Sequence, residues 1–170
     1  GGEYEDQQKS LYSAARFSLT DELTFIAGAR AITLKTEGFS YGNDRKRKND
    51  TILPYAGLVY DLNDEYSVYA SYTEIFNPQK EEGADRQRLD PIEGENYELG
   101  IKGELLDGKL NVSAAVFKTK QSNVAESLRF DPVSGKQLYD GADYLSEGYE
   151  LEVSGEVLPG LQVMGGYTYV

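Results

Sequence analysis

Apolar and polar residues alternate along most of this chain with a period of two. The clearest run covers residues 149–157, where Tyr149, Leu151 and Val153 share one face and Glu150 and Glu152 share the other. Because successive side chains of a strand point to opposite faces, each such run has one apolar and one polar surface. The pattern predicts an all-β protein of about eight strands. We expect them over residues 9–19, 23–36, 51–60, 65–75, 94–105, 109–125, 147–157 and 161–170.

The expected connections alternate between short and long. The short ones cover residues 20–22, 61–64, 106–108 and 158–160, and each contains Asp, Asn, Gly or Pro, which favour tight turns. The long ones cover residues 37–50, 76–93 and 126–146, with a small hairpin expected around residues 131–135. In an antiparallel up-and-down meander, this order places all tight turns at one end and all long loops at the other. Outer-membrane barrels have that asymmetry, and a soluble up-and-down barrel shares it.

The period alone does not decide which face is buried. In a soluble barrel or sandwich the apolar face forms the core, whereas in a large outer-membrane barrel it meets lipid and acids such as Glu98 face a hydrated lumen. Aromatic positions favour the membrane alternative. Tyr60 and Tyr66 flank one tight turn, and Tyr72 and Phe76 lie near the other end of the same strand, as two interfacial girdles require.

Composition excludes several function classes. The net charge of −12 leaves no basic footprint for nucleic acid. The sequence has no Cys and no His. This excludes disulfide bonds, metal sites with thiolate ligands, catalysis by a Ser-His pair and most zinc sites. Among 29 acidic residues a catalytic carboxylate pair is possible, but a solvated face is the simpler interpretation. Asp50, Asp90 and Asp131 lack the spacing of a calcium loop. We expect neither a signal peptide at residues 1–6 nor a membrane-spanning helix.

Several long stretches resemble the barrel of TonB-dependent ferric-siderophore receptors, especially the ferripyoverdine and ferric coprogen group. Order, spacing and turn positions agree over most of the chain, and the long loops are the parts that do not match. The matching text is RFSLTDELTFIAGAR (16–30), LPYAGLVYDLNDEYSVYASYTEIFNPQ (53–79), LDPIEGENYELGIKGELLDGKLNVSAAVFKTKQSNVAE (89–126) and SEGYELEVSGEVLPGLQVMGGYTYV (146–170).

The resemblance implies a transmembrane barrel of about 22 strands that is plugged by an N-terminal domain. Residues 1–170 would then be a mid-barrel portion without the plug, or a shortened barrel, in the bacterial outer membrane. It also implies transport without catalysis. The siderophore itself supplies the ligands of Fe(III), so the protein needs neither a cofactor nor a metal site. The implied partners are a ferric siderophore, TonB, the plug domain, and outer-membrane lipid or lipopolysaccharide.

Family binding residues do not map onto a fixed motif here, so geometry alone nominates side chains for the mouth of the barrel. Aromatic rings could pack on a siderophore and arginines could meet its anionic oxygens. These ligand-binding candidates are Tyr41, Phe76, Arg86, Arg88, Phe130 and Tyr139. The basic cluster at residues 45–48 is a solvated loop tip or a contact for lipopolysaccharide phosphates. Two alternatives remain open at this point, a soluble or engineered β-barrel or sandwich binding module and a glycosidase with two carboxylates.

Overall fold

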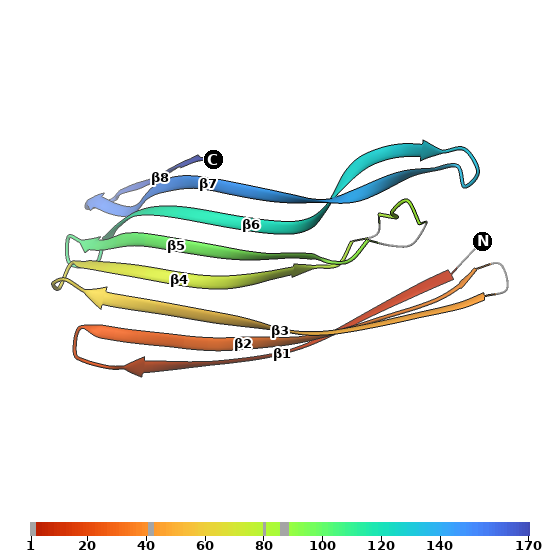
Figure 1. Cartoon of the computed structure of the whole chain (residues 1–170). Coiled ribbons are helices and arrows are strands. Elements are labelled where there is room, and N and C mark those ends of the chain that lie inside the picture. Colours follow the sequence, from red (N-terminus) through yellow and green to blue (C-terminus); the bar gives the residue numbers. More distant parts are fainter. Residues whose placement is uncertain (1–2, 41–42, 80, 86–88) are drawn as a thin grey trace.

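The computed structural model describes residues 3–40, 43–79, 81–85 and 89–170. Within these residues eight strands form one antiparallel sheet in chain order, each paired with its sequence neighbours (Figure 1). This confirms the predicted all-β meander. The strands are β1 (Glu3–Ser18), β2 (Leu23–Ser40), β3 (Asn43–Asp61), β4 (Tyr66–Asn77), β5 (Ile92–Leu105), β6 (Leu110–Asp131), β7 (Lys136–Leu158) and β8 (Leu161–Tyr169).

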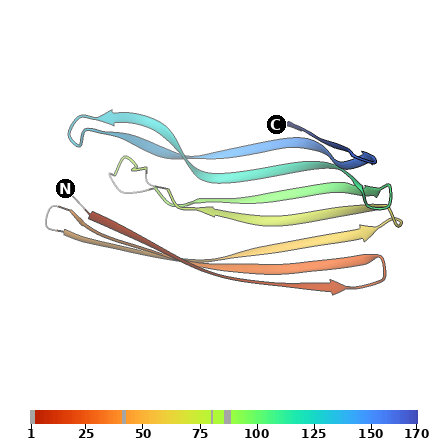
Figure 2. The same ribbon diagram turned by 180° about the vertical axis from the view of Figure 1, so that it is seen from behind.

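The sheet is a single layer. Figures 1 and 2 show its two sides, and neither is covered by a helix or a second sheet in the described part of the chain. Strands β1 and β8 form the two edges, and no pairing joins them among the residues that the structure describes. Within the same residues, no helix is long and apolar enough to cross a membrane.

The tight turns lie together at one end of the sheet, here called the turn end (Figure 1). Side chains and special backbone angles close them. Thr20 Oγ1 accepts hydrogen bonds from the Glu22 and Leu23 amides, at 3.2 and 3.0 Å. Asn63 Oδ1 accepts two from the next strand start, both at 2.8 Å. Gly108 has φ +80°, which glycine adopts without steric cost. The short connections are therefore as the sequence predicted.

Two of the three predicted long loops are wrong. Residues 37–50 and 126–146 belong mostly to strands, because β2 runs to Ser40, β3 starts at Asn43, β6 runs to Asp131 and β7 starts at Lys136. These strands extend as long hairpins toward the opposite end of the sheet, here called the loop end. Strand β1 also starts at residue 3 instead of residue 9. The small hairpin turn at residues 131–135 is present, closed by the Asp131 carboxylate on the Val133 amide and the Ser134 hydroxyl.

Alternation is missing from these extensions for a physical reason. A period of two marks a strand only where its two faces meet different surroundings. Along residues 126–130 of the β6–β7 hairpin, consecutive residues are all exposed, so neighbouring positions meet the same surroundings and no alternation is required. The expected loop between β4 and β5 does remain irregular over the described residues 78–79, 81–85 and 89–91, apart from a single bridge at Glu82.

A seam opens in the sheet between β3 and β4. The two strands pair only from Tyr55–Thr73 to Asp61–Ser67, whereas β3 stays paired with β2 along its whole length. Pro54 stands at the point of separation and has no amide to donate to a ladder. Phe76, 7% exposed, fills the seam and packs with Ile32 and Leu53. Ala115 and Leu138 are the other buried apolar residues in the described part of the chain, and they lie outside this small cluster.

Candidate functional site

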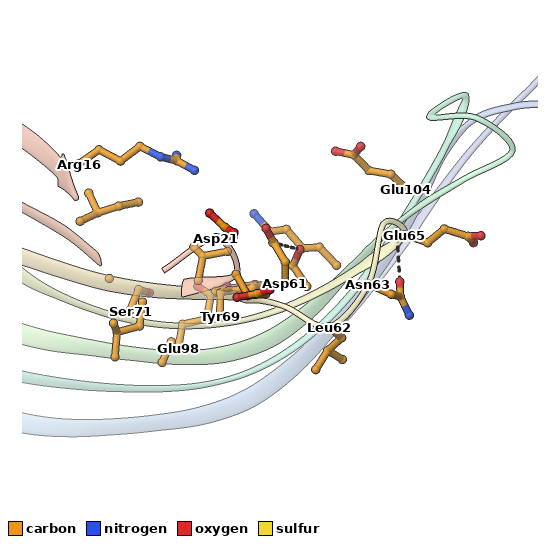
Figure 3. A pocket seen from close by; sticks show the side chains of 18 of the residues that line it. Arg16, Asp21, Asp61, Leu62, Asn63, Glu65, Tyr69, Ser71, Glu98 and Glu104 are labelled. Atoms are coloured by element: carbon orange, nitrogen blue, oxygen red, sulfur yellow. Dashed lines mark hydrogen bonds between the residues drawn. The ribbon is translucent and has the colours of Figure 1, made fainter. Parts of the chain in front are cut away.

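The two faces of the sheet differ in chemistry along its turn-end half. The polar face is hollowed, and the hollow of about 1090 Å³ lies near the turn end (Figure 3). Arg16, Asp61, Tyr69, Glu98 and Lys102 are among its lining residues, from β1, β3, β4 and β5. The polar face is thus the concave one. A sheet that curves toward its polar face has the sense of a barrel with a hydrated lumen.

Tyr69 is the centre of a contact network on this concave face. Its hydroxyl donates to Glu98 Oε1 at 2.5 Å, and Lys102 Nζ lies 4.7 Å from its ring centroid. Gly100 lies opposite Tyr69 in the β4–β5 register. A Cβ at Gly100 would meet the tyrosine ring at 2.5 Å, so the missing side chain lets the ring lie flat on the wall. The ring bridges a carboxylate and an ammonium group on the neighbouring strand.

Across β4–β7 the concave face changes from charged to neutral toward the loop end. Around Tyr69 it carries Glu98 and Lys102. On β7, Glu150 follows in the registered row of Tyr69 and Gly100, and Glu152 follows in the row of Lys102. Nearer the loop end, a row of hydroxyl and amide side chains crosses the sheet, and Thr119 Oγ1 lies 2.8 Å from Asn96 Oδ1. That row is Thr73, Asn96, Thr119 and Ser146. This neutral stretch can hydrogen-bond a ligand without imposing a net charge.

The convex face carries continuous apolar rows. Leu99 and Val116, at the middle of the first row, are 59% and 55% exposed, so no other described part of the chain covers them. Such a surface is too large and too apolar to face water, and it matches the lipid face of a membrane barrel. The first row is Phe17, Phe25, Leu58, Ala70, Leu99, Val116, Tyr149 and Tyr169. The second row is Leu23, Tyr60, Val68, Ile101, Ala114, Leu151 and Tyr167.

Aromatic hydroxyls mark where the apolar rows end on β4 and β5. The rings of Tyr72 and Tyr97 lie 5.2 Å apart, and their hydroxyls donate to Glu74 and Glu95, both at 2.8 Å. Each ring is apolar on the turn-end side and bonded to a carboxylate on the loop-end side. This orientation suits the boundary between hydrocarbon and water, where tyrosine is enriched.

The structure describes three of the six predicted mouth residues, and these three do not form one cluster. Tyr41, Arg86 and Arg88 lie outside the described residues. Phe130 is 61% exposed near the tip of the β6–β7 hairpin, and Tyr139 is half-buried on the same hairpin. Phe76 is buried in the seam, where packing against Ile32 and Leu53 occupies its ring.

The structure adds a polar junction that the sequence did not indicate. Gln79 Nε2 donates to the backbone oxygens of Asp90, at 2.7 Å, and Asn123, at 2.5 Å. Glu82 accepts the Tyr139 amide on its backbone oxygen, at 2.8 Å, and Lys136 on its carboxylate, at 3.0 Å. The connection between β4 and β5 is thereby tied to the β6–β7 hairpin. The sequence signal for this irregularity is Asn123 itself, because asparagine is enriched at positive φ and Asn123 has φ +63°.

The family is decided by comparison of the whole chain with known proteins. The family model described as TonB dependent receptor-like, beta-barrel matches residues 1–170. The chain belongs to this family. Its members are transporters and receptors of the outer membrane, not enzymes. Family membership therefore excludes the two alternatives, a glycosidase and a soluble binding module.

The curated relatives include receptors for pyoverdines. The ferripyoverdine receptor of Pseudomonas aeruginosa is 44% identical over 170 residues, which cover 96% of this chain and 20% of that protein. The ferric-pyoverdine BN7/BN8 receptor of Pseudomonas putida is also 44% identical, over 97% of this chain and 21% of its own length. The chain thus spans about a fifth of the length of these relatives.

Solved receptors share the fold. The crystal structure of the Pseudomonas aeruginosa outer-membrane ferripyoverdine receptor, bound to ferripyoverdine, matches with a TM-score of 0.86 at 41% identity, over 98% of this chain and 23% of that one. The alcaligin outer-membrane receptor of Bordetella pertussis matches with a TM-score of 0.80 at 38% identity, over 99% and 30%. These relatives bind ferric siderophores as ligands, not as enzymatic cofactors.

Proposed function

We propose that residues 1–170 form part of the barrel wall of an outer-membrane receptor that takes up a ferric siderophore. The observation that carries this proposal is the pairing of a hydrated concave face with exposed apolar rows on the convex face. The names of the relatives supply the ligand class. In this proposal a plug domain and TonB, which the sequence resemblance implied, act with the wall, and outer-membrane lipid contacts the convex face.

The siderophore is proposed to enter at the loop end. Its candidate contacts are the exposed ring of Phe130, the half-buried ring of Tyr139, and Tyr41, Arg86 and Arg88. Arginine binds the carboxylate, hydroxamate or catecholate oxygens of such ligands through charge-assisted hydrogen bonds. The neutral row at Thr73 and Asn96 then offers hydrogen bonds farther along the concave face.

Radioactive iron uptake tests this function in cells that make the whole receptor as their single siderophore receptor. We expect uptake of a ferric siderophore that stops when TonB is deleted. Double substitution of Arg86→Gln and Arg88→Gln should weaken binding by about tenfold or more, since each hydrogen bond to a charged group contributes about 1.5–3 kcal/mol. The matched control is Lys109→Gln, which removes an exposed cation at the turn end and should leave uptake unchanged.

Uptake that continues without TonB would contradict the transport proposal. Unchanged affinity in the arginine double variant, at equal receptor levels in the outer membrane, would contradict only the assignment of the mouth residues.

A further inference from the structure

A second pocket, of about 250 Å³, lies at the loop end, apart from the large hollow near the turn end. Its floor belongs to β1–β3. Gln8, Leu34 and Asn49 face each other there in register, and Asp6 pairs with Thr36 in the next row of the same face. Because side chains alternate along a strand, this floor continues the concave face that carries the hollow.

The β4–β5 connection forms the roof of this pocket. It contributes Pro78, Gln79, Leu89 and Pro91. Figures 1 and 2 show the connection between the β1–β3 strands and the β6–β7 hairpin. The Gln79 amide joins the two ends of the connection by donating to the Asp90 backbone oxygen at 2.7 Å. The roof is therefore held in place by hydrogen bonds.

The floor is fixed by packing. Leu34 is half-buried and packs against the buried cluster of Ile32, Leu53 and Phe76. Its partners across the strands, Gln8 and Asn49, are held by the β1–β2 and β2–β3 ladders. The pocket thus lies between two walls that the fold itself positions.

The size of the pocket limits its occupant to part of a siderophore. Sites that enclose a whole drug-sized molecule measure about 300–1000 Å³. A pocket of about 250 Å³ holds one ring or one side chain. Leu34, Leu89 and the two prolines give it apolar walls, and the side chains of Thr36 and Asn49 offer hydrogen bonds. These walls suit a flat apolar group that carries a polar substituent.

The charge of the pocket excludes the iron centre. Asp6 is the one charged side chain among the described residues that line it. The oxygens with which a siderophore binds Fe(III) are anionic, and a carboxylate repels them. No cation among the described lining residues would offset this repulsion. The part of the siderophore that fits is therefore an uncharged group remote from the iron.

We propose that this pocket is a specificity subsite that receives an uncharged aromatic group of the siderophore, away from its iron centre. This inference rests on the proposed function. It gives the barrel wall a means to distinguish siderophores that bind iron in the same way and differ in their side groups.

Fragment binding to the whole receptor in detergent micelles tests the pocket directly, with benzamide as the probe and benzoate as its anionic counterpart. By ligand-observed NMR, benzamide should bind with a Kd of about 1 mM, within what ligand efficiency allows for so small a molecule. Benzoate should bind about tenfold more weakly because of Asp6. Leu34→Trp fills the pocket and should weaken benzamide binding by about tenfold or more. The matched control is Leu19→Trp, at an exposed turn-end position, which should change nothing.

A second variant leaves the buried cluster intact. Thr36→Glu places another carboxylate on the floor of the pocket beside Asp6. It should shift the preference of the pocket from benzamide to the cationic benzamidine by about tenfold, without lowering the temperature of unfolding.

Radioactive iron uptake in cells that make the whole receptor connects the pocket to transport. For the ferric siderophore that the wild type takes up, Leu34→Trp and Thr36→Glu should raise KM several-fold with the maximal rate unchanged, and benzamide should compete. Unchanged KM in both variants, or equal benzamide binding by both variants and the wild type, would overturn the subsite and leave the proposed function standing. Absence of TonB-dependent uptake by the wild type would overturn the proposed function, and this inference with it.

Discussion

The contact between Tyr69 and Gly100 is possible only because glycine has no side chain. The tyrosine ring lies over the glycine, with its hydroxyl on Glu98, and an added Cβ would approach ring atoms to 2.5–2.6 Å. Gly100→Ala should therefore force the ring off the wall and lower the free energy of unfolding by about 1–3 kcal/mol. Denaturant unfolding of the protein in detergent micelles measures this change.

Gly166 provides the control for this contact. It also lies on the concave face of a strand, but an added Cβ would lie 3.7 Å from its nearest neighbour, the Leu151 backbone oxygen. Gly166→Ala should change the stability by less than about 0.5 kcal/mol. Equal losses in the two alanine variants would show that the tyrosine ring plays no special part.

At the scale of elements, the β4–β5 connection and the β6–β7 hairpin should behave as one unit at the loop end. Gln79→Ala removes the side-chain amide that bonds Asp90 and Asn123. Each lost hydrogen bond contributes about 0.5–1.5 kcal/mol, so local opening should become about tenfold more frequent. Amide hydrogen exchange at Leu89 and Tyr139, which donate to Glu81 and Glu82, reports this opening.

The control for the junction is Gln137→Ala. The amide of Gln137 bonds only its neighbour Leu138 among the described residues, at 3.2 Å, so exchange at Leu89 should not change. Faster exchange at Leu89 without any change at Tyr139 would mean that the two elements open independently.

At the scale of the whole molecule, the two faces of the sheet should respond oppositely to a charge. Leu99→Arg places a guanidinium in the first apolar row, where a cation at the bilayer midplane costs about 2–4 kcal/mol. Ser71→Arg places it on the concave face, in register with Glu98, and should cost less than about 1 kcal/mol. Unfolding from lipid vesicles measures both, and a cost at Ser71 as large as that at Leu99 would contradict the assignment of the faces.

The sequence by itself determined the strands of the turn-end half, their tight turns and their order. It did so because the two faces meet different surroundings there, and an alternating pattern such as Tyr97, Glu98 and Leu99 records that difference. It also carried the family resemblance. The long hairpins were missed because apolar and polar residues do not alternate in them, and consecutive residues such as 126–130 are all exposed, which leaves no period to detect.

Only the tertiary structure decided which residues meet. The seam that buries Phe76, the junction at Gln79 and Asn123, and the pocket between Leu34 and Leu89 all depend on register and curvature. Register between strands is a pairwise property of distant segments, and no single segment encodes it locally. In the turn-end half, the alternation of the sequence therefore determined which side chains share a face, and the pairing of the strands determined which residues each side chain contacts.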